Sequence, residues 1–208
     1  MKKGLFIVFE VGEKVGKTTQ LRRLKEYLEQ KGCSVVSSKE PGGGDPSLRE
    51  QLLALGNTLT REEELAFFCK DRKLHIKHVI SPALQQGKIV ICDRFEPSTI
   101  AYQGYERGMD ITLIKKESAK ARNGVWPNLI ILLDANPEVV LSREKATSRF
   151  DAEKLDFHKR VRAGFLAEAK ADPQNWRIVD ATQPLEIVWK NIQNNIIEFL
   201  ALRKETKK

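Results

Sequence analysis

The chain has 208 residues, with 36 Lys and Arg against 28 Asp and Glu, which gives a net charge of +8. This length predicts one domain over residues 1–208 whose core needs no disulfide or metal support. No stretch approaches the roughly 20 apolar residues of a membrane span, so we expect no membrane association. The basic charge fits either nucleic-acid binding or a site for small polyanions such as nucleotides. Because no basic stripe with interleaved aromatics is present, we expect no nucleic-acid partner.

The cysteines Cys33, Cys69 and Cys92 are odd in number and lack the spacing of a metal site. Cys33 and Cys92 lie in apolar, strand-like runs and are expected in the core. This usage suits a reducing compartment, so we expect a cytoplasmic protein.

In chain order, short apolar runs alternate with segments of helical period. The expected strands are Leu5–Phe9, Cys33–Ser37, Ile89–Cys92, Leu129–Leu133 and Trp176–Val179. The expected helices are Lys17–Gln30, Pro46–Leu55, Arg61–Val79, Pro97–Gln103, Ile111–Ala121, Pro137–Lys145, Ala152–Lys170 and Pro184–Leu202. This alternation predicts an α/β fold, in which a five-stranded parallel sheet carries helices on both faces. Ligands of such sheets bind beyond the carboxyl ends of the strands.

A candidate phosphate loop joins the first strand to the first helix. It reads Val11-Gly12-Glu13-Lys14-Val15-Gly16-Lys17-Thr18. A strand, a turn with inward N–H groups and a helix N-terminus together make an anion site. Lys17 would reach the β- and γ-phosphates of a nucleotide, and the Thr18 hydroxyl would bind Mg²⁺. Val11 stands where the usual pattern has glycine, so Gly12 takes over the flexible position or the loop enters at a different angle.

Charged residues also follow the next two strands. Lys39 comes after the second strand, and Asp93-Arg94 comes directly after the third. An acid in this position can hold Mg²⁺, and an arginine can bind phosphate through two parallel hydrogen bonds. The alternative for this pair is a helix-capping aspartate beside a surface arginine.

Phe68 and Arg72 are four residues apart on the long expected helix and therefore share a face. A ring and a guanidinium on one face can hold a flat heterocycle by stacking and hydrogen bonding. The alternative places Phe68 in the core and pairs Arg72 with a nearby acid such as Asp71. Of the three histidines, none shows metal spacing, and His75 is expected to be structural.

Arg143 and Arg149 flank a polar, basic segment that resembles a lid, at about residues 143–153. Arginines on a closing loop can neutralise charge on a phosphoryl group in transfer. The alternative is a solvated basic loop.

Five pieces of sequence, in this order and at these separations, carry a resemblance to a known family. They are Phe9–Gln20 with the phosphate loop, Glu40-Pro41-Gly42-Gly43, Phe68-Cys69-Lys70-Asp71-Arg72, Asp93-Arg94-Phe95 with Ser98–Gly104, and Asp180–Pro184. With them, nearly the whole chain resembles the thymidylate kinases, a family of P-loop nucleoside monophosphate kinases. The resemblance implies a three-layer α/β/α P-loop NTPase fold with a short lid. It also implies the reaction of ATP with dTMP to give ADP and dTDP, with Mg²⁺, and a homodimer.

The resemblance also implies a role for each matched residue. Residues Val11–Thr18 would bind ATP, with Thr18 and Asp93 serving the metal. Phe68 would stack on thymine and Arg72 would bond its carbonyl. The remaining dTMP contacts would be Arg94 and Lys39 at the phosphate, Glu13 at the deoxyribose end, and Ser98, Tyr102 and Gln103 around the base and sugar. The catalytic set would be Lys14, Lys17, Arg94, Arg143 and Arg149.

Three positions depart from the family pattern. Val11 replaces the first loop glycine, and Lys39 replaces an arginine, which keeps the charge but loses the two-pronged geometry. Lys14 stands where bacterial members usually have glycine, and we hypothesise that it supplies charge near the transferred phosphoryl group. Two rivals remain open: a kinase for another nucleotide or deoxynucleoside, and a nucleotide-binding protein that has lost catalysis.

Overall fold

The computed structural model describes residues 4–12, 16–55, 58–141 and 155–205. Its strands form one sheet in the order β2-β3-β1-β4-β5, and every neighbouring pair is parallel. The strands are β1 (Leu5–Val11), β2 (Val35–Lys39), β3 (Ile89–Asp93), β4 (Leu129–Asp134) and β5 (Trp176–Asp180). The predicted five-stranded parallel sheet is therefore confirmed.

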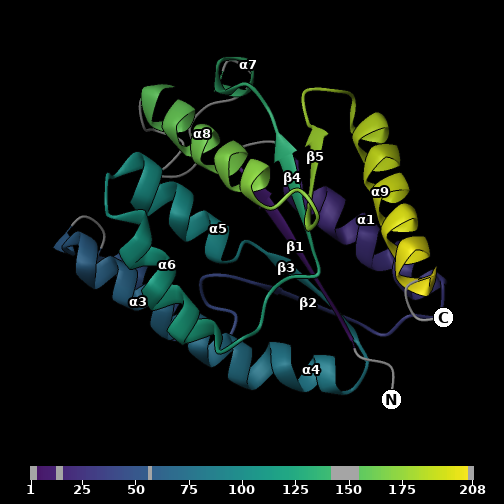
Figure 1. Ribbon diagram of the computed structural model, residues 1–208, viewed down its shortest axis with the longest axis horizontal. Helices are drawn as coiled ribbons and strands as arrows, with labels where there is room; N and C mark the ends of the chain where they lie inside the picture. The colour runs from purple at the N-terminus through teal and green to yellow at the C-terminus, as the bar shows by residue number, and fades with distance from the viewer. Residues whose placement is uncertain (1–3, 13–15, 56–57, 142–154, 206–208) are drawn as a thin grey trace.

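Helices cover both faces of this sheet (Figure 1). The helices are α1 (Lys17–Gln30), α2 (Pro46–Leu55), α3 (Arg61–His75), α4 (Ser81–Gln85), α5 (Glu96–Thr99), α6 (Ile111–Arg122), α7 (Pro137–Leu141), α8 (Leu155–Ala171) and α9 (Leu185–Glu205), with π-helical segments η2 (Ile76–Ile80) and η3 (Ile100–Glu106). In Figure 1, α1 and α9 lie on one side of the sheet, and α5 and α8 lie on the other with α3 and α6 beyond them. The three-layer architecture is confirmed. Within the described ranges, no helix is both long and apolar enough to cross a bilayer.

The central strand β1 is buried on both faces, as expected for a parallel sheet under two helical layers. Phe6 and Val8 pack in the cluster that includes α8, whereas Ile7 and Phe9 pack in the cluster that includes α1 and α9. This alternation follows from the two-residue period of a strand. It places Glu10, which has the parity of Phe6 and Val8, on the α5 and α8 side of the sheet.

The pairing register aligns the carboxyl ends of three strands. Asp93 at the end of β3 is level with Phe9 of β1 on one side and with Lys39 of β2 on the other. The backbone N–H of Glu40 donates to the Asp93 carbonyl over 2.9 Å, which continues the contact past the last residue of β2. The segments that the sequence marks for phosphate chemistry therefore leave the sheet at one edge.

Candidate active site

The start of α1 lies at this edge, beside the end of β3. Gly16 caps the helix in the left-handed conformation with φ of 75°, and Lys17 is the first helical residue. The Lys17 Nζ lies 2.5 Å from Asp93 Oδ1. The structure thus brings together the lysine and the acid that were both expected to serve a nucleotide. The loop between β1 and α1 contains Glu13, Lys14 and Val15, which lie outside the described residues.

Directly after Asp93, the backbone turns sharply at Arg94. This arginine has φ of 69°, in the left-handed region that side-chain-bearing residues rarely occupy. Its guanidinium lies over the Tyr102 ring, 5.2 Å from the centroid. Nη1 donates to Ser98 Oγ over 3.2 Å and to the Tyr102 hydroxyl over 3.3 Å. Three residues expected around the acceptor nucleotide, Arg94, Ser98 and Tyr102, are therefore in mutual contact.

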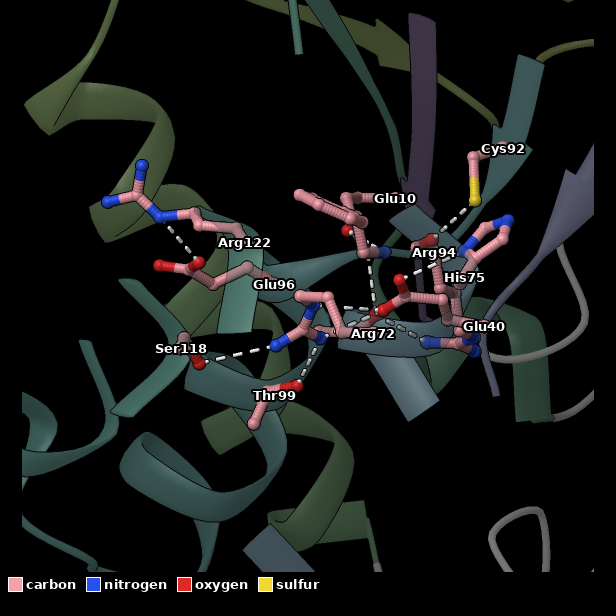
Figure 2. A network of polar contacts seen from close by, with 12 residues as sticks. Glu10, Glu40, Arg72, His75, Cys92, Arg94, Glu96, Thr99, Ser118 and Arg122 are labelled. Carbon is pink, nitrogen blue, oxygen red and sulfur yellow. Dashed lines mark hydrogen bonds and ion pairs between the residues drawn. The ribbon is translucent and has the colours of Figure 1, made fainter. Parts of the chain in front are cut away.

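Arg72 of α3 is the centre of a buried polar network (Figure 2). Its side chain is 1% exposed, and its Nε donates to Glu40 Oε2 over 3.0 Å. On the other side, Nη2 donates to Thr99 Oγ1 over 2.9 Å and Nη1 donates to Ser118 Oγ over 3.2 Å. The guanidinium carbon also lies 5.1 Å from the centroid of the Phe95 ring. Arg72 is thus fixed from the loop after β2, from α5 and from α6, and its acidic partner is Glu40 instead of the neighbouring Asp71.

The second oxygen of Glu40 joins this network, through His75 at the end of α3, to Ser38 on β2. Glu40 Oε1 lies 3.1 Å from Nδ1 of the fully buried His75, whose Nε2 lies 2.6 Å from Ser38 Oγ. A Cβ on Gly44 would collide with the backbone of Leu74 and His75, so the loop packs directly on α3. His75 is structural, as expected, and it links β2 to the helix that carries Phe68 and Arg72.

Two cross-helix contacts lie on either side of Phe68 on α3. Glu64, Phe68 and Arg72 are successive positions four residues apart, so they follow one face of the helix. Arg72 bonds Thr99, and Glu64 Oε2 accepts a hydrogen bond from Gln103 Nε2 over 3.1 Å. Phe68 is half-buried between these two contacts. The Gln103 Oε1 atom is buried and accepts no hydrogen bond from the described residues.

Burial and charge shift several ionisation equilibria in this region. Burial acts to lower the pKa of Arg72, but the Glu40 and Glu96 carboxylates outweigh it and the pKa is raised. Burial raises the pKa of Asp71 to about 6, with the Glu40 charge adding to the effect. Burial also raises the pKa of the Cys92 thiol well above its ordinary value, so this cysteine is not a nucleophile. The guanidinium of Arg72 therefore stays charged at any physiological pH.

Some expected site residues are placed apart from these contacts, and others are not described. Thr18 is exposed at the start of α1, and Lys39 is exposed at the end of β2. Arg143, Arg149 and the lid segment lie outside the described residues. Five contributors had no assigned role in the sequence: Glu10, Glu40, Glu64, Thr99 and Ser118. Glu10, Glu40 and Thr99 lie within pieces of sequence that carry the family resemblance, whereas Glu64 and Ser118 carried no signal.

A lysine–aspartate pair between a helix N-terminus and the neighbouring strand end, at the carboxyl edge of a parallel sheet, is the arrangement of a P-loop nucleotide-binding protein. The family model for thymidylate kinase matches residues 9–192. The thymidylate kinase of Synechococcus sp. (strain JA-3-3Ab) is 43% identical over 199 residues, which cover 93% of this chain and 97% of that protein. The thymidylate kinase of Thermomicrobium roseum is also 43% identical, over 94% of this chain and 95% of the relative.

A solved structure agrees with these sequence relatives. The crystal structure of thymidylate kinase from Ehrlichia chaffeensis superposes with a TM-score of 0.77 at 32% identity, over 93% of this chain and 99% of that one. The chain therefore belongs to the thymidylate kinase family.

Proposed function

We propose that the chain transfers the γ-phosphoryl group of ATP to dTMP, giving ADP and dTDP, with the two nucleotides end to end along the carboxyl edge of the sheet. Family membership supports the reaction. The proposed site rests on contacts of two consecutive residues, Asp93 and Arg94. Asp93 pairs with Lys17 at the start of α1, and Arg94 donates hydrogen bonds to Ser98 and Tyr102. A donor site and an acceptor site that share one turn suit a direct transfer between bound nucleotides.

On the donor side, residues 11–18 would surround the ATP phosphates. Lys17 would exchange its contact with Asp93 for the β- and γ-phosphates. The Thr18 hydroxyl and the Asp93 carboxylate are hard oxygen donors of the kind that Mg²⁺ prefers, so they would hold the metal. When bound, Mg²⁺ would neutralise charge on the phosphates.

On the acceptor side, Arg94 would bind the dTMP phosphate, with Lys39 close by at the end of the adjoining strand. A phosphate oxygen of dTMP attacks the γ-phosphorus, the bond to the bridging oxygen breaks, and ADP leaves with that oxygen. Little covalent chemistry is required, so positioning and charge neutralisation supply the rate. Lys14, Arg143 and Arg149 would add positive charge around the transferred group, the arginines from a lid at about residues 143–153. Glu13 would face the deoxyribose.

Thymine would lie against Phe68, between the two cross-helix contacts of α3. A guanidinium can only donate hydrogen bonds, so Arg72 suits the O4 carbonyl of thymine. Gln103 Nε2 donates one hydrogen bond to Glu64 Oε2, which leaves the Gln103 carbonyl oxygen as an acceptor. An acceptor suits the N3–H of thymine and opposes cytosine, whose N3 is itself an acceptor. The donor and acceptor pattern therefore favours thymine and uracil over cytosine.

The test is a coupled ADP-release assay with ATP and a panel of dTMP, dUMP, dCMP and thymidine. We expect the highest kcat/KM for dTMP, dTDP as the product, and activity that chelation removes and added Mg²⁺ restores. A preference for dCMP or thymidine would favour the rival kinase. Binding of ATP and dTMP without dTDP would indicate a binding protein that has lost catalysis.

We also propose a homodimer in the cytoplasm, formed by one domain over residues 1–208. Leu53 and Leu55 on α2 and Leu113 on α6 are exposed, and α3 packs against both helices. Apolar side chains in such positions can pair with a second copy. Sedimentation equilibrium would show a mass twice that of the 23.7 kDa chain, and Leu53→Glu would shift this mass toward that of the monomer. The cysteines Cys33, Cys69 and Cys92 are unpaired, which suits a reducing compartment.

A further inference from the structure

Glu10 is a buried carboxylate on the central strand β1. It is 0% exposed, and it follows Phe6 and Val8 on the α5 and α8 side of the sheet. Burial raises its pKa to about 7, against the opposing effects of the Ser98 hydroxyl, Arg94, the Phe95 N–H and Lys17. A carboxylate in such a position destabilises the fold unless its hydrogen bonds compensate. The phosphate loop itself starts at the next residue and does not require an acid here.

Both oxygens of Glu10 contact the turn that follows β3. Oε1 accepts a hydrogen bond from the backbone N–H of Phe95 over 2.8 Å, and Oε2 accepts one from Ser98 Oγ over 2.5 Å. The same Ser98 oxygen accepts a hydrogen bond from Arg94 Nη1. Glu10 therefore reaches Arg94 in two ways: through the backbone of Phe95, the residue after Arg94, and through the Ser98 hydroxyl, which the guanidinium also contacts.

This turn needs external support. Arg94 has a left-handed backbone, which is unfavourable for a residue with a side chain. Two hydrogen bonds from the turn to β1 oppose that cost: the Arg94 N–H donates to the Phe9 carbonyl over 2.9 Å, and the Phe95 N–H donates to Glu10. The first uses the backbone and tolerates any residue at position 9. The second depends on the side chain of residue 10.

We infer that Glu10 is a positioning residue for phosphoryl transfer, which holds the Arg94 turn so that the guanidinium faces the acceptor phosphate. This inference rests on the proposed role of Arg94 in binding dTMP. Glu10 touches neither nucleotide in this arrangement. Its removal weakens the use of dTMP and leaves the use of ATP nearly unchanged, because the support acts on the acceptor side of the shared edge.

The test is a double-mutant cycle in the full-length enzyme with Glu10→Leu and Arg94→Met. For Glu10→Leu we expect kcat/KM for dTMP to fall about 10- to 100-fold, the loss that a misplaced binding group produces, with the KM for ATP within about threefold of wild type. Because Glu10 acts through Arg94, the double variant should be no worse than Arg94→Met alone. Glu10→Gln keeps an acceptor for the Phe95 N–H and should recover part of the loss. If Glu10→Leu does not fold, the same cycle is run with Glu10→Gln.

The matched control is Glu96→Gln, which alters another buried carboxylate on α5, one that pairs with Arg122 of α6 over 3.0 Å. The fold-change in kcat/KM for dTMP caused by Glu96→Gln should multiply with the fold-change caused by Arg94→Met. The inference would be overturned if the fold-changes of the Glu10 and Arg94 substitutions in kcat/KM for dTMP multiplied. It would also be overturned if Glu10→Leu impaired the use of ATP and of dTMP equally. Either result would leave the proposed reaction intact. An Arg94→Met enzyme with unchanged dTMP kinetics would overturn both the role of Arg94 and the inference. A wild-type enzyme without dTDP formation would instead refute the proposed function.

Discussion

Replacing Glu40 by glutamine tests whether the buried network sets the position of Arg72. Glu40 is 6% exposed and receives Arg72 Nε at 3.0 Å and Nη2 at 2.9 Å on one oxygen, and His75 Nδ1 at 3.1 Å on the other. Glutamine has the same shape but no charge, so the guanidinium would remain buried without the Glu40 charge, while the Glu96 carboxylate still acts on it. Removing one partner of a buried ion pair costs about 3–5 kcal/mol. Since the glutamine oxygen can still accept one hydrogen bond, we expect the lower end, about 3 kcal/mol.

Two measurements check this expectation. In a chain of this length, a loss of about 3 kcal/mol lowers the Tm by about 6–12 °C. Urea unfolding should show the same loss as a lower midpoint with an unchanged slope. In steady-state assays the KM for dTMP should rise more than the KM for ATP, because Arg72 lies on the acceptor side.

The control for Glu40→Gln is Glu29→Gln on α1. Glu29 pairs with Lys25 at 3.8 Å, and both side chains are close to half exposed. Exposed pairs of this kind contribute about 0–1 kcal/mol. A Glu40→Gln enzyme that is as stable as this control and keeps its KM for dTMP would refute the view that Glu40 fixes Arg72.

Three further predictions concern the loop after β2, the central strand and the phosphate loop. Gly44→Ala should lower the free energy of unfolding by about 1–3 kcal/mol in urea titrations, because the new Cβ collides with the backbone of α3. The pKa of Glu10 rises on folding from 4.5 to about 7, so the native state binds the proton more tightly and stability falls as pH rises through this window. At about 1.4 kcal/mol per pH unit, the stability of wild type relative to Glu10→Gln should be about 3 kcal/mol lower at pH 8 than at pH 4.5; a difference that does not change with pH would contradict the shift. Lys14→Gly, in the part of the loop outside the described residues, should reduce kcat more than it raises the KM for ATP, and unchanged turnover would refute the charge that we assign to Lys14.

Most elements could be predicted because their signals are local. Helix α1 spans the predicted Lys17–Gln30, since a glycine lies at each end and the apolar positions between them keep the helical period. The helix predicted to end at Val79 instead continues through η2 and α4 to Gln85. In η2 the Ser81 N–H bonds the Ile76 carbonyl, five residues back, and this wider turn accommodates Pro82 within the helical run. Sequence period alone cannot show that change of hydrogen bonding.

Strand β2 was predicted at Cys33–Ser37 and is found at Val35–Lys39. The prediction followed the apolar residues, whereas the pairing with β3 sets the real limits, from Val35 opposite Ile89 to Lys39 opposite Asp93. Cys33 is accordingly only partly buried, in contrast to the core position expected for it. The shift matters for function, because it carries Lys39 to the end of the strand and level with Asp93.

The site residues also divide into those whose arrangement follows from local spacing and those whose contacts depend on the tertiary structure. The spacing of Phe68 and Arg72 is local, so the sequence could predict that they share a face. The partner of Arg72 could not be predicted, because Glu40 is 32 residues away and meets it only when the loop after β2 packs on α3. The contact of Glu10 with Ser98 joins residues 88 apart for the same reason. Contacts between segments follow from the tertiary arrangement and leave no spacing signal in one sequence.

The valine in place of the first loop glycine also has a physical explanation in the fold. A β-branched residue resists positive φ, so valine would be unfavourable at a loop position that requires a left-handed backbone. In the structure β1 extends past the predicted Phe9, and Val11 is its last residue, paired with Leu133 and 1% exposed. Among the described residues at this edge, positive φ is found at Gly16, Gly42 and Arg94 instead. Position 11 therefore requires extended backbone and an apolar side chain, both of which valine supplies, so this substitution gives no support to a loss of catalysis.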